Sequence, residues 1–561
     1  MDSQSVCHSR AFLIGVLGVA ALLVYAGSLQ NQFVEWDDDS LVTKNPLTQH
    51  MTAETVYGAF TSYDPELYVP LTIVSFQIEH AVFGFKPFMY HLDNLLLHII
   101  VSSLVLLLLE RLGLRRGTAF LGAILFAIHP LNTEAVAWVS ARKDLLSTLF
   151  SLCAILSYLQ HKTSQLRQWD WRTFVLVLLA MLCKPVSIMV PFVFLLIDWK
   201  EDGRITKRDV IKKLPLFALS AFFVVIGLIG KHRNIGALTF YQTVLLGIKS
   251  TVFSLQKFLW PTSLSSLYLQ TDPISIRLVQ FWIPLLLCGI VGISLLIVVQ
   301  RLRSSPHRSL TAGGIFVIGT LWYLLFLLPS FSNFAKDHSI YFFSDRYVYL
   351  SQVGLLFAIG WCLDYVQKKI VWIIGTPLLC LLAWQAHAQS LVWKDSETLY
   401  RDALRKNERS AVMHYDIGLI EQKRGHAALA REEYNTTLMI DPRYAKALTN
   451  LGMLERDAGN IAHALELLHQ ATVAEPRSPE PHNNIGSILM DRGDTDGAIA
   501  EFQAAITLRP DFAQAHINLA SALGRKELYA EGLEEYRKAF SLDPELRAQL
   551  PEIQKALESL P

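Results

Sequence analysis

The sequence has few cysteines and little charge for a chain of 561 residues. All six cysteines precede residue 388, five of them in apolar runs where a thiol packs as a small hydrophobic group. No disulfide scaffold or thiolate zinc site is therefore expected. Charged residues make up 18% and hydrophobic residues 52%, which argues against a single soluble core. The net charge of +1 also argues against nucleic acid as a partner.

The charge that is present lies mostly near the C-terminus. Of the 99 Asp, Glu, Lys and Arg residues, 47 fall in the last 174 positions and 52 in the first 387. The front part has more basic than acidic residues (30 against 22), and the rear part has the reverse (20 against 27). We therefore predict an integral-membrane domain over 1–387 and a water-exposed domain behind it.

The front part alternates apolar runs with polar connections. Residues 11–29 form the first run, which we interpret as a retained membrane helix because it is longer than a signal-peptide core and no convincing cleavage site follows it. Together the runs predict about eleven spans in an all-α polytopic bundle. The later runs cover 92–110, 118–130, 144–160, 173–184, 187–199, 214–230, 281–300, 312–330, 347–363 and 370–387.

Basic residues predict the orientation, because connections rich in Lys and Arg stay in the cytoplasm. Five connections of the front part are rich in Lys and Arg, and we place them on the cytoplasmic side. The N-terminus is then cytoplasmic, and the first outer loop (about 30–91) and the C-terminal domain lie on the outer face. We expect a bacterial inner membrane and periplasm, or an endoplasmic reticulum membrane and lumen if the chain is eukaryotic. The basic connections lie near 111–116, 162–172, 200–213, 301–308 and 368–369.

The rear part repeats every 34 residues, as Pro442, Pro476, Pro510 and Pro544 show. That period is typical of tetratricopeptide repeats, which are helix pairs stacked into an α-solenoid. We expect the groove of such a solenoid to bind an acceptor protein, whereas the plain alternative is a passive spacer. The predicted segments are a half-repeat and linker over 388–410, four repeats over 411–546 (411–444, 445–478, 479–512 and 513–546) and a cap over 547–561.

An acidic cluster follows the first apolar run, in the segment FVEWDDDSLVTKNP. Carboxylates crowded at a membrane surface repel one another unless a cation or a cationic side chain meets them. Asp37 and Asp38 could bind Mg²⁺ or Mn²⁺, or one of them could act as a general base toward a hydroxyl. The plain alternative is a solvated turn, so a metal cofactor stays open.

Three further outer segments carry polar groups close to apolar runs. His91 starts a run in which burial would penalise an imidazole, unless it faces a cavity or a partner. Each segment also has a plainer interpretation, such as a snorkelling Lys or a helix-capping Asp. The other two segments contribute His129, Glu134, Arg142, Lys143 and Asp144, and Asp345, Arg346 and Tyr347.

Several of these motifs resemble the transmembrane-and-tetratricopeptide-repeat (TMTC) proteins and their bacterial relatives, in order along nearly the whole chain. The motifs are WDDDSLVTKNP, YVPLTIVSFQIEHAVFGFKPFMYHLDNLLLHI, LFAIHPLNTEAVAWVSARKDLLSTLF, CKPVSIMVPFVFLLIDW, FSDRYVYLS and WKDSETLYRDAL. The resemblance implies a GT-C-like membrane glycosyltransferase. Such an enzyme moves a mannose-like hexose from a polyprenyl-phosphate donor in the bilayer to a Ser or Thr hydroxyl of an acceptor protein.

The resemblance also implies roles for individual residues. Asp37 would be the base toward the acceptor hydroxyl, and Asp38 its orienting partner or a metal ligand. Arg142, Lys143 and Arg346 would bind the donor phosphate, because guanidinium and ammonium groups stabilise a leaving group that gains charge. Further sugar or phosphate contacts would come from His91, His129, Glu134 and Lys184.

Two other functions remain open from the sequence. A membrane-anchored scaffold would use the spans only to hold the repeats outside, where they assemble other proteins without catalysis. A transporter would line a solute path with its scattered charges. Substitution of Asp37 or Asp38 separates these cases, because only the enzyme would lose activity.

Overall fold

A computed structural model gives the fold of residues 3–63, 67–163, 170–230, 238–304, 312–336, 339–543, 546 and 550–558. Parts of two basic connections, at 164–169 and 305–311, lie outside these residues, as does Pro544. The chain forms two compact units, Met1–Lys406 and Asn407–Pro561. Each is described separately below.

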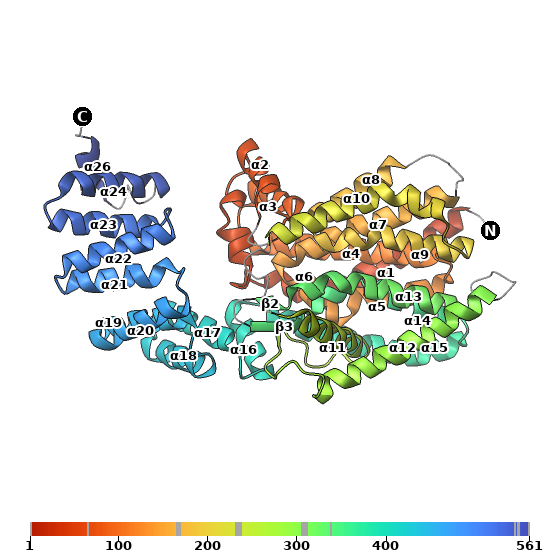
Figure 1. Ribbon diagram of the computed structural model, residues 1–561. Helices are drawn as coiled ribbons and strands as arrows, with labels where there is room; N and C mark the ends of the chain where they lie inside the picture. The colour runs from red at the N-terminus through yellow and green to blue at the C-terminus, as the bar shows by residue number, and fades with distance from the viewer. Residues whose placement is uncertain are drawn as a thin grey trace. The chain divides into compact units, whose positions relative to one another are not determined.

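The first unit is almost entirely helical, as expected (Figure 1). Prolines stand at the first position of several of its helices, where a missing N–H costs nothing; Pro70 and Pro87 are two of them. Its helices are α1 (Ser3–Tyr25), α2 (Ala53–Thr61), α3 (Pro70–Phe83), α4 (Pro87–Arg111), α5 (Arg116–Ile128), α6 (Thr133–Ala137), α7 (Arg142–Thr163), α8 (Trp171–Cys183), α9 (Val190–Asp202), α10 (Lys207–Gly230), α11 (Phe240–Leu259), α12 (Val279–Ser304), α13 (Ala312–Leu327), α14 (Gln352–Leu363), α15 (Lys368–Ser390) and α16 (Ser396–Lys406).

Six helices of the described chain are long and apolar enough to cross a membrane, or seven if α5 and α6, which meet at a 50° bend, form one span. The chain is thus a membrane-spanning protein, but the expected count of about eleven is not confirmed. Several of the expected spans are shorter helices, such as α8 and α14. The six segments are Arg10–Gln30, Pro87–Arg111, Lys207–Gly230, Val279–Gln300, Gly313–Asn333 and Lys369–Trp393.

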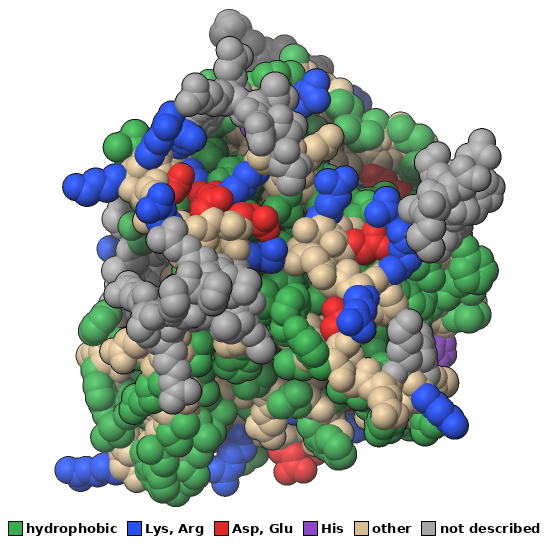
Figure 2. Space-filling view, turned by 90° about the vertical axis from the view of Figure 1, so that its right-hand side faces the viewer, with side chains coloured by type: hydrophobic (Ala, Val, Ile, Leu, Met, Phe, Trp, Pro, Cys, Tyr) green, Lys and Arg blue, Asp and Glu red, His purple; other side chains and the backbone are tan. Residues whose placement is uncertain are grey.

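The membrane unit has two apolar cores. The larger one runs through the bundle, and a smaller one lies under α2 and α3, where Val42, Phe76 and Tyr90 are fully buried. Figure 1 shows α2 and α3 at the end of the bundle away from the N-terminus. Figure 2 shows the opposite end, where Lys and Arg side chains are spread among apolar ones. The segment between α1 and α4 is therefore a packed structure with its own core.

A small antiparallel sheet interrupts the helices, in the order β1 (Tyr268–Leu269), β3 (Ser339–Phe343), β2 (Ala335–Lys336). Tyr268 pairs with Phe343. The sheet therefore brings the segment after α11 beside Asp345 and Arg346, which directly follow β3.

The second unit is the expected stack of helix pairs. In two of the pairs the glycine has a steric cause: a Cβ on Gly418 would lie 2.6 Å from the Tyr434 ring, and one on Gly486 2.6 Å from the Phe502 ring. Only glycine lets the two helices of a pair approach this closely. The pairs are α17 (Ala411–Lys423) with α18 (Ala427–Ile440), α19 (Ala445–Asp457) with α20 (Ile461–Ala474), α21 (Pro479–Asp491) with α22 (Thr495–Leu508) and α23 (Ala513–Arg525) with α24 (Tyr529–Leu542), followed by α26 (Pro551–Glu558).

Candidate functional site

Asp38 is fully buried and holds the segment after α1 against the segment before α7. One of its carboxylate oxygens accepts the Val34 N–H (3.0 Å), and the other accepts the Ser140 N–H (2.9 Å) and hydroxyl (2.5 Å). Burial nevertheless outweighs these hydrogen bonds and raises the pKa of Asp38 to about 6. This residue holds two loops together.

Asp37 points elsewhere and is one-fifth exposed. Its Oδ2 lies 3.9 Å from the Nζ of Lys143, which stands in the first turn of α7. Lys143 also lies over the Trp138 ring, with Nζ 5.5 Å from the centroid. A water-accessible carboxylate and a buried ammonium therefore face each other across the two loops.

Arg346 reaches the same place from the segment after β3. Its guanidinium lies over the Trp138 ring at 4.8 Å and forms an ion pair with the buried Glu134. Its backbone N–H donates to the same carboxylate at 3.0 Å. The Nε–H of Arg346 and the indole N–H of Trp138 have no hydrogen-bond partner among the described residues. Buried donors of this kind suit a ligand rich in oxygen.

Lys184 completes the cluster from the break between α8 and α9. Its Nζ donates to Asp144 Oδ1 at 2.5 Å and lies 5.8 Å from the Tyr347 ring centroid. The charges of Lys143, Lys184 and Arg346 are close enough to interact with one another. Four separate segments thus bring Asp37 and three cations together, and two of the cations, Lys184 and Arg346, are also paired with the carboxylates of Asp144 and Glu134. We call Asp37, Lys143, Lys184 and Arg346 the charged cluster.

Arg142 does not join the charged cluster. It is 2% exposed, and each nitrogen of its guanidinium has a partner. The group forms an ion pair with Glu79 and donates to Asn94 Oδ1 (3.0 Å) and to the Tyr90 carbonyl (3.0 Å). It also lies 4.7 Å from the Phe76 ring centroid. This arrangement ties α3, α4 and α7 together.

The two candidate histidines are also buried away from the charged cluster. His129 accepts from the Leu131 N–H (3.2 Å) and is bonded through Nε2 to the Phe258 carbonyl (3.0 Å), whose ring it stacks on. His91 is 1% exposed, and its ring lies beside the backbone of Asn31 and Gln32. His129 thus fixes the turn after α5, while His91 packs at the start of α4.

Exposure separates the groups that a substrate can reach from those that support them. The side chains of Asp37, Arg346 and Lys184 are 20%, 16% and 13% exposed. Lys143 is 5% exposed and Asp38 is fully covered. The first three are therefore the groups placed to touch a ligand.

The acidic pair does not fit a divalent cation. Both oxygens of Asp38 already accept hydrogen bonds from the protein, so they offer poor ligands. Within the described ranges, no three His, Cys, Asp or Glu side chains are grouped so that they could hold a metal. We therefore derive no step through Mg²⁺ or Mn²⁺.

The end of the last candidate span and the residues after it pack onto the same loop. Trp393 stacks on Trp138 with centroids 5.5 Å apart, and the Gln32 N–H donates to the Lys394 carbonyl at 2.8 Å. Glu35, two residues before Asp37, donates its N–H to Ser396 Oγ (2.8 Å), and the Tyr400 hydroxyl donates to its carbonyl. The start of α16 therefore supports the backbone that carries Asp37.

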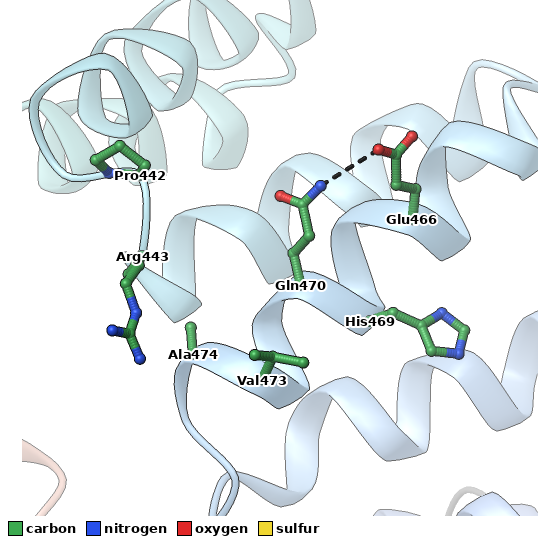
Figure 3. A pocket seen from close by; sticks show the side chains of 7 residues that line it. All are labelled: Pro442, Arg443, Glu466, His469, Gln470, Val473 and Ala474. Carbon is green, nitrogen blue, oxygen red and sulfur yellow. Dashed lines mark hydrogen bonds between the residues drawn. The ribbon is translucent and has the colours of Figure 1, made fainter.

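A separate hollow of about 600 Å³ lies on the second repeat (Figure 3). Gln470 donates to Glu466 at 3.3 Å across one side of it. The hollow contains none of the residues singled out from the sequence. It is lined by Pro442, Arg443, Glu466, His469, Gln470, Val473 and Ala474.

Comparison with protein families identifies the repeats directly. A model described as TPR repeat matches residues 486–527, and one described as tetratricopeptide repeat matches residues 513–546.

Curated relatives match a larger part of the chain. The human protein O-mannosyl-transferase TMTC1 is 26% identical over 514 residues, 78% of this chain and 56% of that protein. The protein O-mannosyl-transferase F38B6.6 of Caenorhabditis elegans is 24% identical and covers 76% of this chain and 62% of its own. The human protein O-mannosyl-transferase TMTC4 is 24% identical, and the match covers 75% of this chain and 65% of that protein. The resemblance to TMTC proteins is confirmed, although the chain spans less than two thirds of the length of these relatives.

Solved structures match only a part of the chain. The crystal structure of MamA covers 27% of the chain and 90% of its own length, at 19% identity and a TM-score of 0.24. The crystal structure of YrrB, a TPR protein, covers 32% of this chain and 87% of its own length, at 21% identity and a TM-score of 0.23.

Proposed function

We propose that this protein is a membrane glycosyltransferase. It moves a hexose, mannose by analogy with its relatives, from a polyprenyl-phosphate donor to a Ser or Thr hydroxyl of an acceptor protein. The observation that carries the proposal is the charged cluster, in which the partly exposed carboxylate of Asp37 lies near three cations. A lipid-linked phosphosugar needs this combination of groups, since its phosphate attracts cations while the attacking hydroxyl needs a base.

Asp37 is the general base in this reaction. The acceptor hydroxyl oxygen forms a bond to the anomeric carbon, and its proton passes to the Asp37 carboxylate. The bond between the anomeric carbon and the donor phosphate oxygen breaks, and the lipid phosphate leaves with the electron pair. Lys143, 3.9 Å from Asp37, orients the carboxylate. Much of the rate gain comes from holding both substrates in this geometry.

Arg346 and Lys184 bind the phosphate that leaves. Both are partly exposed, and the Nε–H of Arg346 is an unused buried donor among the described residues. A guanidinium can hold a phosphate through two parallel hydrogen bonds that strengthen as negative charge develops on it. Glu134 keeps Arg346 in place through its ion pair and its bond to the Arg346 N–H.

The remaining candidates are positioning residues. Asp38 ties the loop of Asp37 to Ser140, and Arg142 ties α7 to α3 and α4. His91 and His129 pack the helices that carry these loops. The repeats bind the acceptor protein in this proposal, because a tethered binding domain raises the local concentration of its ligand.

The purified full-length chain in detergent tests the proposal. It is incubated with polyprenyl-phosphate mannose or polyprenyl-phosphate glucose and with a Ser/Thr-rich protein, and the intact mass of the protein is recorded. The proposal expects a hexose-sized increment on the acceptor with one of the donors. A chain that binds the acceptor but transfers neither sugar would instead be a scaffold, and solute flux in vesicles without product would indicate a transporter.

A further inference from the structure

Three of the four repeats join their two helices through a histidine and a glutamate. The histidine stands in the first helix of the pair, and the glutamate stands 19 residues later, in the second helix. The second repeat has leucines at these two positions, Leu448 and Leu467, which are 2% and 5% exposed. The bonds run from the ring Nδ1 to the carboxylate, in the pairs His414 and Glu433 (2.7 Å), His482 and Glu501 (2.7 Å), and His516 and Glu535 (2.5 Å).

In the first and fourth repeats both ring nitrogens of the histidine face acceptors. His414 Nε2 lies 3.2 Å from the Glu408 carbonyl oxygen, and His516 Nε2 lies 3.0 Å from the Pro510 carbonyl oxygen. A carbonyl and a carboxylate can only accept hydrogen bonds, and a neutral imidazole has a single N–H. Both bonds can therefore be made at once only by a protonated ring, in which both nitrogens donate.

The protonated form is favoured in the first repeat. The side chain of His414 is 18% exposed, and its hydrogen bond to Glu433 raises the pKa of the ring in spite of this burial. A deprotonated ring would leave one of its two acceptors without a donor. The stabilisation is therefore complete below about pH 6.5, where an unfolded histidine titrates. It is lost as pH rises through the higher pKa of the folded chain.

Other charged groups act differently on the two histidines. Among the described residues, Glu433 of α18 is the charged side chain that acts on His414. In the fourth repeat Lys538 also donates to Glu535, at 2.7 Å. Burial would raise the pKa of Glu535, but the hydrogen bonds from Lys538 and His516 lower it. Glu535 thus retains a cation when His516 is neutral, so the fourth repeat should respond less to pH than the first.

Two further histidines pair with glutamates near the turn between the helices of a pair. His426 Nδ1 lies 2.8 Å from Glu421, and His463 Nδ1 lies 3.8 Å from Glu455. The side chains of these histidines are 55% and 54% exposed. Exposed pairs contribute little to stability. They therefore serve as controls for the buried pairs.

From this arrangement we propose that the repeat unit is pH-sensitive: protonated His414 clamps α17 to α18, protonated His516 clamps α23 to α24, and both clamps weaken as the solution becomes more alkaline. The proposal goes beyond the proposed function and does not depend on it. Histidine suits this role because its charge changes near neutral pH. The second repeat, with Leu448 and Leu467 in the same place, should not respond.

Hydrogen exchange in the full-length chain in detergent tests the proposal. Exchange is followed by mass spectrometry at about pH 6 and about pH 8, which span the titration of a histidine, and is corrected for the intrinsic effect of pH on amide exchange. We expect the protection of α17 and α18 to fall roughly two- to tenfold between the two conditions, the effect of losing about one hydrogen bond. Protection of α23 and α24 should fall less, and that of α19 and α20 should stay unchanged.

The second repeat supplies a matched replacement for the pair. His414→Leu/Glu433→Leu copies Leu448 and Leu467, and it should make the exchange of α17 and α18 independent of pH. The control variant His426→Gln removes an exposed histidine from the same repeat and should retain the pH dependence.

Equal protection of α17 and α18 at both pH values in the unmodified chain would overturn the proposal. A pH dependence that persists in His414→Leu/Glu433→Leu would also overturn it, and its loss in His426→Gln would assign the effect to the exposed pair instead. If a variant fails to fold, the unmodified chain still decides, since an equal response of the first and second repeats would contradict the proposal. No sugar donor or acceptor enters the experiment, so its outcome is independent of the proposed function.

Discussion

The indole rings of Trp138 and Trp393 stack with their centroids 5.5 Å apart and an interplanar angle of 22°. Lys143 and Arg346 lie over the ring of Trp138, which precedes α7, while Trp393 is the last residue of the Lys369–Trp393 candidate span. Both rings are buried. Trp393 therefore supports the Trp138 ring, over which two cations of the charged cluster lie.

Trp393→Ala should therefore lower both stability and activity. Truncation of a buried Trp removes its packing and leaves a cavity, at a cost of about 3–5 kcal/mol, and it frees Trp138 to shift beneath the two cations. The melting temperature and kcat/KM for sugar transfer measure the two effects. Trp393→Phe, which retains an aromatic ring, should keep most of the stability and most of the activity. Equal losses of stability and activity in the Ala and Phe variants would contradict this account.

Arg142→Met and Glu79→Gln should each destabilise the protein, because each leaves a buried charge or donor without its partner. Breaking a buried pair typically costs about 3–5 kcal/mol. The double variant should lose less stability than the sum of the losses in the two single variants. KM for the donor should change little in the variants that fold. If Arg142→Met raised the donor KM at unchanged melting temperature, Arg142 would be a phosphate ligand instead.

Asp38 should make stability depend on pH. Its pKa is about 6 in the folded chain and about 3.9 in an unfolded one. The folded state therefore binds the proton more tightly, and the stabilisation is complete below about pH 4 and lost as pH rises through about 6. The total change is about 2–3 kcal/mol. The melting temperature of the unmodified chain relative to Asp38→Ala should fall across this window and be constant above pH 7; a rise would contradict the assignment.

The repeats allow a matched pair of glycine substitutions. In Gly486→Ala the new Cβ would lie 2.6 Å from the Phe502 ring, whereas at Gly524 nothing lies within 4 Å. Overpacking should cost about 1–3 kcal/mol at Gly486. Gly524→Ala should be neutral or slightly stabilising, since alanine favours helix. Limited proteolysis within the repeats compares the two variants, and equal protection would contradict the packing described here.

The periodic features of the fold could be predicted from the sequence. The 34-residue spacing of Pro442, Pro476 and Pro510 predicts the repeats because each unit must bury the same surfaces. The number of spans could not be predicted in this way. Helices such as α8 and α14 are short, and apolar length alone does not show how a short helix is placed.

The individual site residues were harder to assign. Residue type makes Arg142 and Lys143 equivalent, but one pairs with Glu79 and the other with Asp37. They differ because successive positions on a helix point about 100° apart. The sequence analysis missed Glu79 and the stacking of Trp138 on Trp393. An acidic residue within the apolar helix α3 was the available signal for the first; no local pattern predicts the second, which joins residues 255 positions apart.

Asp37→Asn is the most direct test of the central claim, with Asp39→Asn as its matched control. Asp39 is the neighbouring acid and forms an exposed pair with Lys44 at 3.3 Å. With a polyprenyl-phosphate hexose and a Ser/Thr-rich acceptor, kcat should fall about 100- to 10,000-fold in Asp37→Asn, the range for loss of a general base. Asp39→Asn should keep kcat within about twofold. Full turnover by Asp37→Asn would contradict the account.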